Sequence, residues 1–400
     1  MNKLAIILGI FLTTWGAFGC TDSSEGSHSI DNIPTPTLYP TSTSNVTNWH
    51  LSTETSNKSF LSENIDTVIL VKPETNDDCL IGSISGIFAH GDSIIVIDAS
   101  KAQAIYVFDK DGKYISSIGT KGEGPDEYGS INAVKLNNNK LYILDWIKNQ
   151  IVFYPLDKGE IGHRTFKKMR PDNFAILNDS ITLGAYASYF EQNPFALTWV
   201  GENGEILQTS RPFTYTQPLP SGRFQNTFDN KILYHRNDCD TIFEIKEDCI
   251  IPIYTLGLGN HFYDFVDDNK DLSRAEFYKK LYTDDSSPLN MYDFYESNKM
   301  WIVHFQKGSK AYLSTVDKNN GKSKNYLRSD INKQEIYVPF VFFSGDGDHI
   351  LSYIDNTFVE KVSEKDKAKL FEAFPYIEKT VYDYDFENLN PLICIMRLKQ

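Results

Sequence analysis

Two stretches of the chain, Ile94-Ile95-Val96-Ile97-Asp98 and Leu141-Tyr142-Ile143-Leu144-Asp145, decide the fold because each one opens the same hairpin. Each Asp is followed five residues later by a Gln, and each Gln begins a second apolar segment. Aromatic and β-branched residues in such short runs favour β-strands. The two copies therefore indicate a repeated β unit.

Each hairpin leads into a turn that ends in Gly, at Asp109-Lys110-Asp111-Gly112 and Asp157-Lys158-Gly159, and the turn returns at Glu202-Asn203-Gly204. Gly beside Asp or Asn is the signature of a tight hairpin, because the turn needs a residue with positive φ. The three Gly positions lie about 45 residues apart, which is the period of a four-stranded propeller blade.

The repeat predicts an all-β fold, a six-bladed β-propeller. We expect five blades over residues 83–118, 131–166, 174–209, 223–256 and 291–327. A sixth blade begins with Phe340–Phe343 and Asp348–Ile354. Two lone strands, Ile65–Val71 and Pro391–Leu398, have no local partner and are expected to complete this blade. Joining the two ends of the chain in one blade would close the ring and protect strand edges.

Two helical insertions interrupt the repeat, at Leu258–Leu289 and Thr357–Asn388. The first contains an apolar stripe after an acidic start, and the second has Ser363 in a capping position before Glu364. Both lie at links that should open on one face of the ring. We therefore expect both to stand beside the mouth of the central channel.

The N-terminus has the order of a secretory signal: Lys3, the apolar run Leu4–Leu12, and then small residues. This run is too short to cross a bilayer, which needs about 20 residues. The sequence Ala17-Phe18-Gly19-Cys20 resembles a bacterial lipobox, which predicts acylation of Cys20. The alternative is an ordinary cleaved signal with an incidental Cys. The expected organisation is a signal peptide at 1–20, a flexible Ser/Thr/Pro-rich tether at 21–58 and the propeller at 59–400.

Composition excludes one class of partner. The formal net charge is −14, and nucleic-acid binding needs a basic surface. Four cysteines besides Cys20 allow three disulfide pairings, and their spacing does not choose among them. No Cys-x-x-Cys unit or pair of His at ligand spacing occurs, so we predict no metal and no cofactor.

The loop Gly119-Thr120-Lys121-Gly122-Glu123-Gly124-Pro125-Asp126-Glu127-Tyr128 resembles the signature of the six-bladed β-propeller lipoproteins of Bacteroidetes, a family similar in form to NHL-repeat propellers. The ending Asn390-Pro391-Leu392-Ile393 is also similar to the closing strand of that family. The resemblance covers about residues 65–400 and implies the fold and an envelope location. We expect this location to be the outer membrane, on its periplasmic or cell-surface side. It implies no reaction.

No catalytic motif is present: Gly-x-Ser-x-Gly and His-Glu-x-x-His do not occur, and the Gly119–Gly124 loop lacks the Lys-Ser/Thr of a phosphate-binding loop. Function in propellers concentrates in the loops of one face. The aromatic and basic residues expected on that face suit sugars, peptides or anionic groups. They are Tyr128, Trp146, Arg170, Tyr186, Tyr189, Arg211, Tyr215, Arg223, His235, Arg236 and His304.

Arg223, His235 and His304 are expected nearest the channel axis. We predict a membrane-anchored envelope lipoprotein that binds a small ligand or serves as a scaffold for a protein partner, rather than an enzyme. The alternative is an envelope hydrolase or lyase with its active site at the channel mouth. An acid–base pair that converges in the channel would favour the enzyme.

Overall fold

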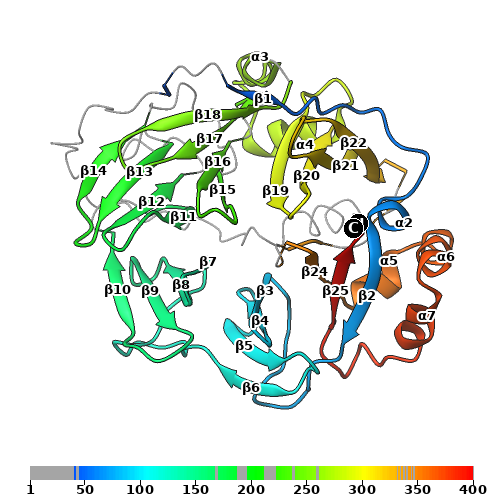
Figure 1. Cartoon of the computed structure of the whole chain (residues 1–400), viewed down its shortest axis with the longest axis horizontal. Coiled ribbons are helices and arrows are strands. Elements are labelled where there is room, and N and C mark those ends of the chain that lie inside the picture. Colours follow the sequence, from blue (N-terminus) through cyan, green and yellow to red (C-terminus); the bar gives the residue numbers. More distant parts are fainter. Residues whose placement is uncertain are drawn as a thin grey trace.

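Six β-sheets stand around a common centre in the computed structural model, each with its innermost strand toward the middle (Figure 1). The predicted all-β, six-bladed propeller is therefore confirmed. The structure describes residues 40–41, 45–166, 170–186, 196–210, 222–236, 239–257, 261–330, 332–333, 335–336, 338, 341–343, 345 and 347–399.

The first three blades are four-stranded antiparallel sheets with strands in chain order from the centre outward. Blade one contains β3 (Gly86–His90), β4 (Ser93–Asp98), β5 (Ala104–Asp109) and β6 (Tyr114–Ser117). Blade two contains β7 (Ala133–Asn137), β8 (Lys140–Asp145), β9 (Gln150–Pro155) and β10 (Gly162–Thr165). Blade three contains β11 (Asn173–Ile176), β12 (Ile181–Ala185), β13 (Leu197–Gly201) and β14 (Ile206–Thr209).

Blades four and five each carry a fifth strand. Blade four contains β15 (Arg223–Asn226), β16 (Ile232–His235), β17 (Thr241–Ile245), β18 (Ile250–Thr255) and, at its outer edge, β1 (Thr47–Asn48). Blade five contains β19 (Asn290–Glu296), β20 (Met300–Lys307), β21 (Lys310–Asp317), β22 (Ser323–Asp330) and β23 (Glu335–Ile336).

Blade six closes the ring with both ends of the chain, as predicted. The C-terminal strand β25 (Leu392–Leu398) lies between β24 (His349–Ile354) and the N-terminal strand β2 (Ile65–Val71). Phe343 pairs with Leu351 on the channel side of β24, and their two backbone hydrogen bonds measure 2.8 and 3.2 Å. Phe340 lies outside the described residues.

Residues 45–58, which we expected to belong to a flexible tether, instead form a belt along the outer rim of blades four and five. The backbone of β1 pairs in parallel with β18, and Ser56 N donates to Asn325 O of β22 at 2.8 Å. Trp49 is 1% exposed because it packs against Tyr254 and Trp301. Although the segment is mostly polar, two of its apolar residues, Trp49 and Leu51, are buried. The expectation of a flexible tether is therefore wrong for residues 45–58.

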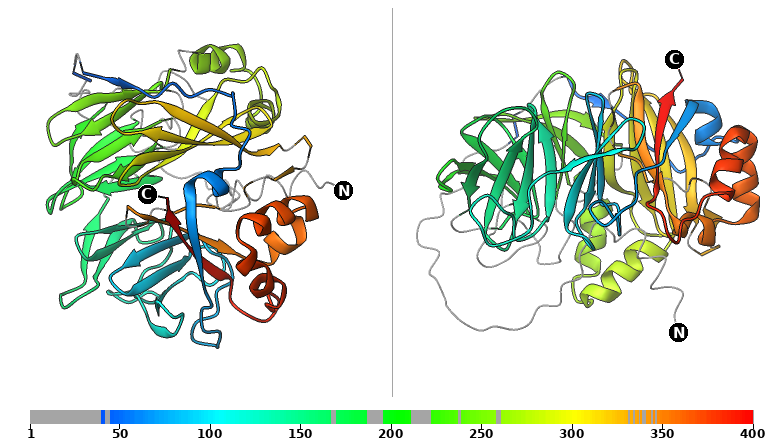
Figure 2. Two further views of the ribbon diagram at one scale, coloured as in Figure 1. Left: turned by 45° about the vertical axis from the view of Figure 1, so that its right-hand side comes forward. Right: turned by 90° about the horizontal axis from the view of Figure 1, so that it is seen from below.

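The first insertion forms α3 (His261–Asp268) and α4 (Arg274–Thr283), which lie on one face of the ring (Figure 2, right). Ser273 and Glu276 form a capping box that starts α4. The two helices share a small core that contains Phe265, Phe277 and Leu281.

The second insertion does not stand beside the channel mouth, which corrects our expectation. It forms α5 (Asn356–Lys361), α6 (Glu364–Ala373) and α7 (Pro375–Tyr382), and α6 and α7 lie outside β2 on the rim (Figures 1 and 2). Their apolar residues join one core with α2 (Phe60–Asn64) and blade six. Tyr376 Oη accepts a hydrogen bond of 2.8 Å from Val68 N. The insertion therefore covers the edge strand of the closing blade.

Buried Asp side chains fix the links between blades. Asp145 is fully buried and accepts backbone N–H groups from Gly129, Ser130, Ile147 and Lys148 at 2.7–3.2 Å. Asp98 does the same for Gly82, Ser83 and Lys101, each at 2.8 Å. The repeated Asp of the sequence is thus a structural acceptor, which offsets the cost of burying a carboxylate.

Candidate ligand site in the central channel

Lys135 is the charged residue at the centre of the ring that the sequence prediction missed. It lies in β7, the innermost strand of blade two, and its Nζ donates to Phe224 O of blade four at 3.3 Å. The side chain keeps part of its surface accessible, so it faces the channel from a deep position. Burial and the nearby charge of Arg223 lower the pKa of Lys135 from 10.5 to about 8, although Asp293 opposes the shift.

Arg223 begins β15 and is partly exposed, as expected for a residue beside the channel. Its charge also acts on Tyr282 of α4 and on Tyr295 of blade five. Within the described part of the chain, neither Arg223 nor Lys135 forms an ion pair. Two cations from different blades therefore share the channel without a compensating carboxylate in contact.

Asp293 and Tyr295 face this pair from β19 of blade five. The Tyr295 hydroxyl donates to Asp293 Oδ2 at 2.8 Å, and Phe294 N donates to Oδ1 at 3.0 Å. Burial and the adjacent Asp293 carboxylate raise the pKa of Tyr295 well above its ordinary value. The phenol therefore stays protonated and donates to Asp293, whose carboxylate acts electrostatically on Lys135.

A β-bulge in β19 places Tyr292 beside these residues. The register shifts between Met291 and Asp293, so Tyr292 has no partner position on β20. Its hydroxyl accepts a hydrogen bond of 3.2 Å from Arg328 Nη1. Bulges redirect side chains and are common beside functional sites. The partly exposed ring of Tyr292 therefore forms a wall of the same site.

His304, predicted near the axis, lies behind the tyrosines. Its ring contacts Tyr292, Tyr295 and Phe342, and its Nε2 has no hydrogen-bond partner among the described residues. Burial, with a smaller effect of Arg328, lowers the pKa of His304 well below 6.5. The imidazole is therefore neutral and buried, 4% exposed, and it supports the tyrosine wall instead of facing the channel.

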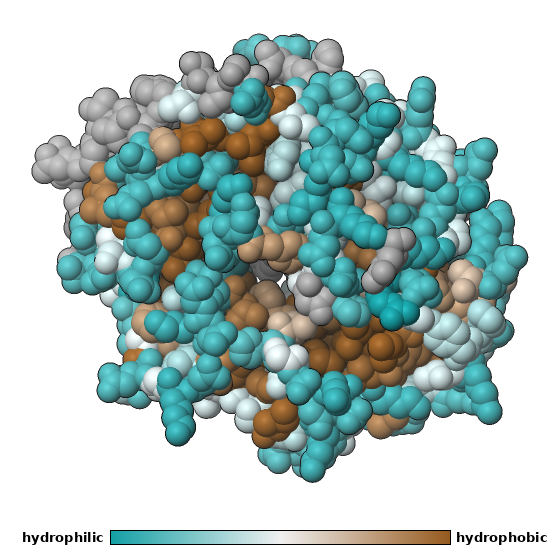
Figure 3. Space-filling view, viewed as in Figure 1, coloured by the Kyte–Doolittle hydropathy of each residue, from teal (hydrophilic) through white to brown (hydrophobic). Residues whose placement is uncertain are grey.

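Tyr282 brings the first insertion to the site. It lies near the C-terminal end of α4, and burial raises its pKa to about 12, with Tyr292 and Arg223 as its charged or titratable neighbours. The hollow at the centre of the ring is visible in the space-filling view (Figure 3). Blades two, four and five and the first insertion together supply the candidate site.

Three other predicted residues have structural contacts. Tyr128 is 1% exposed and donates to Gln103 O at 3.1 Å between blades one and two. Trp146 Nε1 donates to Pro171 O at 2.8 Å and packs between blades two and three. His235 is buried, and its Nε2 lies 3.0 Å from Cys239 O in the following loop. Each side chain therefore forms a hydrogen bond with a backbone carbonyl of a connecting segment.

The remaining predicted residues do not join the channel cluster in the described structure. Arg236 and Tyr186 are buried, and the Tyr186 hydroxyl lies 3.1 Å from Thr198 Oγ1. Arg170 is exposed. Several calls lie outside the described residues: Cys20, Tyr189, Arg211 and Tyr215.

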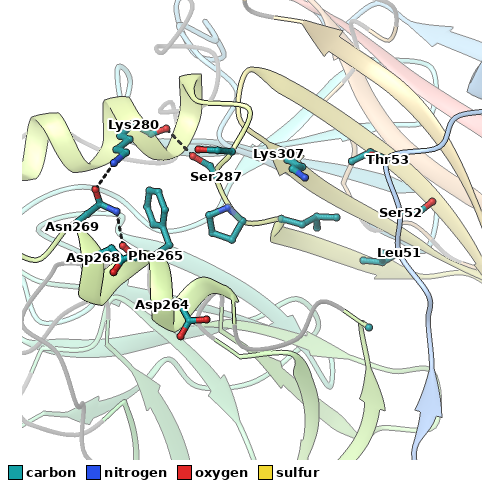
Figure 4. Close-up of a pocket in the computed structure, with 14 residues that line it drawn as sticks. Leu51, Ser52, Thr53, Asp264, Phe265, Asp268, Asn269, Lys280, Ser287 and Lys307 are labelled. Carbon is teal, nitrogen blue, oxygen red and sulfur yellow. Dashed lines mark hydrogen bonds between the residues drawn. The ribbon is translucent and has the colours of Figure 1, made fainter.

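A separate pocket of about 620 Å³ lies between the belt, the first insertion and blade five (Figure 4). Lys280 Nζ donates to Asn269 Oδ1 at 2.7 Å, and Asn269 Nδ2 donates to Phe265 O at 2.7 Å. Ser287 Oγ donates to Lys280 O at 2.9 Å. These polar groups satisfy one another, and none of the residues predicted as a site lines the pocket.

The cysteines and potential metal ligands of the described residues form no cluster. The four cysteines of the described chain, Cys79, Cys239, Cys249 and Cys394, are free thiols. No cluster of three or more potential metal ligands occurs among the described residues. No helix within the described ranges is long and apolar enough to span a membrane.

The class of protein follows from this geometry: a six-bladed propeller with a charged channel. The chain belongs to the family described as "Domain of unknown function (DUF4934)", whose model matches residues 46–397. This bears out the family resemblance of the Gly-Pro loop and the closing strand. No match was found among curated proteins.

One solved structure supports the same fold. A "Putative exported protein" from Bacteroides fragilis NCTC 9343 has a TM-score of 0.68 at 17% identity, covering 87% of this chain and 98% of that one. Virginiamycin B lyase from Staphylococcus aureus gives a TM-score of 0.42 at 12% identity, with 72% and 81% covered. The WD40 repeats of RRP9 give 0.43 at 9% identity, with 83% and 97% covered. The last two scores are too low to support any conclusion.

Proposed function

We propose that the protein is an exported, lipid-anchored propeller that binds a small molecule in its central channel. The observation that carries the proposal is the meeting of Lys135 and Arg223 in the channel without an ion pair among the described residues. An uncompensated charge in a confined site is costly unless water or an anionic group meets it. A site that retains both cations beside a single carboxylate, which is already hydrogen-bonded, is suited to a ligand that supplies a further negative charge.

Retention of small molecules tests this function. Wild-type protein would be incubated with the small-molecule fraction of a bacterial culture, washed, denatured and analysed by mass spectrometry. We expect a compound released from the wild type and from the exposed control Lys113→Met, but not from Lys135→Met. Equal release from all three proteins would rule out the channel as the binding site and leave scaffolding of a protein partner.

Export and anchoring are part of the proposal. Support comes from the order of charged, apolar and small residues before Cys20, and from the similarity to a protein described as exported. We expect mass spectrometry of the mature N-terminus to find an acylated Cys20, and Cys20→Ser to release the protein from membranes. Unchanged membrane association of Cys20→Ser would contradict the anchor.

The enzyme alternative is favoured by one observation, the convergence of Lys135 with the hydrogen-bonded pair Asp293 and Tyr295. A lysine whose pKa lies near 8 can accept a proton in its neutral form, and a protonated phenol can donate one. The discriminating experiment is to incubate the retained compound with the protein. Conversion to a product by the wild type but not by Tyr295→Phe would establish catalysis, whereas release unchanged would establish binding alone.

A further inference from the structure

The charges that face Lys135 can be counted. Among the described residues, the groups whose charge acts on its ammonium are Arg223 and Asp293, which give two positive charges and one negative charge with Lys135 itself. The Asp293 carboxylate is already engaged by the Tyr295 hydroxyl and by Phe294 N. The described residues at the centre of the channel therefore carry an excess of one positive charge when Lys135 is protonated.

The neighbouring titratable groups do not change this count near neutral pH. Burial keeps His304 uncharged by lowering its pKa and keeps Tyr292 and Tyr295 protonated by raising theirs. Arg328, the remaining cation of this region, is buried on β22 and donates to the Tyr292 hydroxyl at 3.2 Å. It lies behind the tyrosine wall.

The walls of the site consist of uncharged tyrosine rings. Tyr282 from α4 and Tyr292 and Tyr295 from β19 each keep part of their surface accessible. Tyrosine rings offer flat apolar faces to a cyclic ligand, and their hydroxyls can exchange hydrogen bonds with it. Arg223 can hold a carboxylate through two parallel N–H groups, with Lys135 as a second point charge.

On the basis of the proposed channel site, we infer that its ligand is a cyclic molecule with a single carboxylate, which sits between Lys135 and Arg223 while its ring lies against the tyrosine wall. One negative charge balances the excess positive charge. A neutral ligand would leave a confined cation unpaired. A dianion such as a phosphate monoester would bring a second negative charge toward Asp293.

A matched series of probes tests this inference by isothermal titration calorimetry. Glucuronate, glucose and glucose 6-phosphate share one ring and differ in charge, and benzoate with benzyl alcohol forms a second pair that distinguishes an aromatic acid from a sugar acid. We expect one of the two carboxylates to bind at least tenfold more tightly than its neutral counterpart. In the sugar series we expect glucuronate to exceed glucose 6-phosphate.

Variants locate the binding. Arg223→Gln should weaken binding of the carboxylate probe at least tenfold, Arg223→Lys should restore part of it, and the exposed control Arg170→Gln should bind as the wild type does. Circular dichroism and a thermal melt would verify that each variant is folded.

Two sets of results would overturn the inference. The first is that a neutral probe binds as tightly as its carboxylate counterpart, or that glucose 6-phosphate binds more tightly than glucuronate. The channel would then still be the binding site, but for a different class of ligand. The second is absence of binding by both carboxylates. The retention assay with Lys135→Met separates this second result from failure of the channel site itself, because that assay does not assume the charge of the ligand.

Discussion

The links between the first blades and the centre of the channel both contain charged side chains away from bulk water, but the two regions treat them differently. At the links, Asp145 accepts four backbone N–H groups and is fully buried. In the channel, Lys135 has one carbonyl acceptor at 3.3 Å and a second cation nearby. Complete satisfaction marks a group that holds the fold, and incomplete satisfaction marks a group available to a ligand.

The largest effect on stability should follow from removing the buried Asp145 carboxylate at a link between blades. In Asp145→Ala, four backbone N–H groups lose their acceptor at once, and we expect the free energy of unfolding to fall by about 4 kcal/mol. Denaturant unfolding would measure it. Asp111→Ala, on an exposed hairpin, is the matched control and should change stability by less than about 0.5 kcal/mol. A small loss in Asp145→Ala would erase the contrast between the two regions.

The second largest effect should be the contribution of Lys135 to the pH dependence of stability. Its pKa is lowered from 10.5 to about 8 in the folded chain, so between these values the unfolded chain binds more protons than the folded one. Stability contributed by this residue therefore rises with pH through that window, by about 3 kcal/mol. Chemical denaturation of the wild type minus Lys135→Met at several pH values isolates the effect. A flat difference would mean that Lys135 has an ordinary pKa.

Removing a channel cation should have a smaller effect, in the stabilising direction. Arg223→Gln relieves the repulsion of Lys135, and we expect the ligand-free protein to gain about 1 kcal/mol near neutral pH. Thermal or denaturant unfolding of the ligand-free protein measures this gain. Destabilisation by more than about 1 kcal/mol would place Arg223 among the structural groups.

The smallest effect should come from an aromatic residue that the sequence placed on the functional face. Trp146→Phe removes the hydrogen bond of Nε1 to Pro171 O, at 2.8 Å, but keeps an apolar ring between blades two and three. We expect a loss of about 0.5 kcal/mol in stability and no change in ligand retention. Loss of retention in a folded Trp146→Phe protein would extend the site toward blade three.

The hairpin repeat, its Asp residues and the lone terminal strands were sufficient to predict the propeller and its closure. These features are local or periodic: alternation of apolar residues, turn residues with positive φ such as Gly112 at 92° and Gly204 at 78°, and two strands without a neighbour. The composition of residues 21–58 was less informative. The segment is polar on average, but Trp49 is buried against Trp301, and this one contact fixes part of the segment to the propeller.

The candidate site depended on the tertiary structure. Arg223 could be nominated because it begins an inner strand, but Lys135 sits in the middle of a strand and looks like any solvent-facing lysine in sequence. Asp293 and Tyr295 are likewise unremarkable until the ring places blade five opposite blade two. The sequence determined which strands form and how the ring closes, since those depend on local patterns. Only the packed ring decided which charges meet at the axis, because residues 135, 223 and 293 approach one another only when separate blades converge.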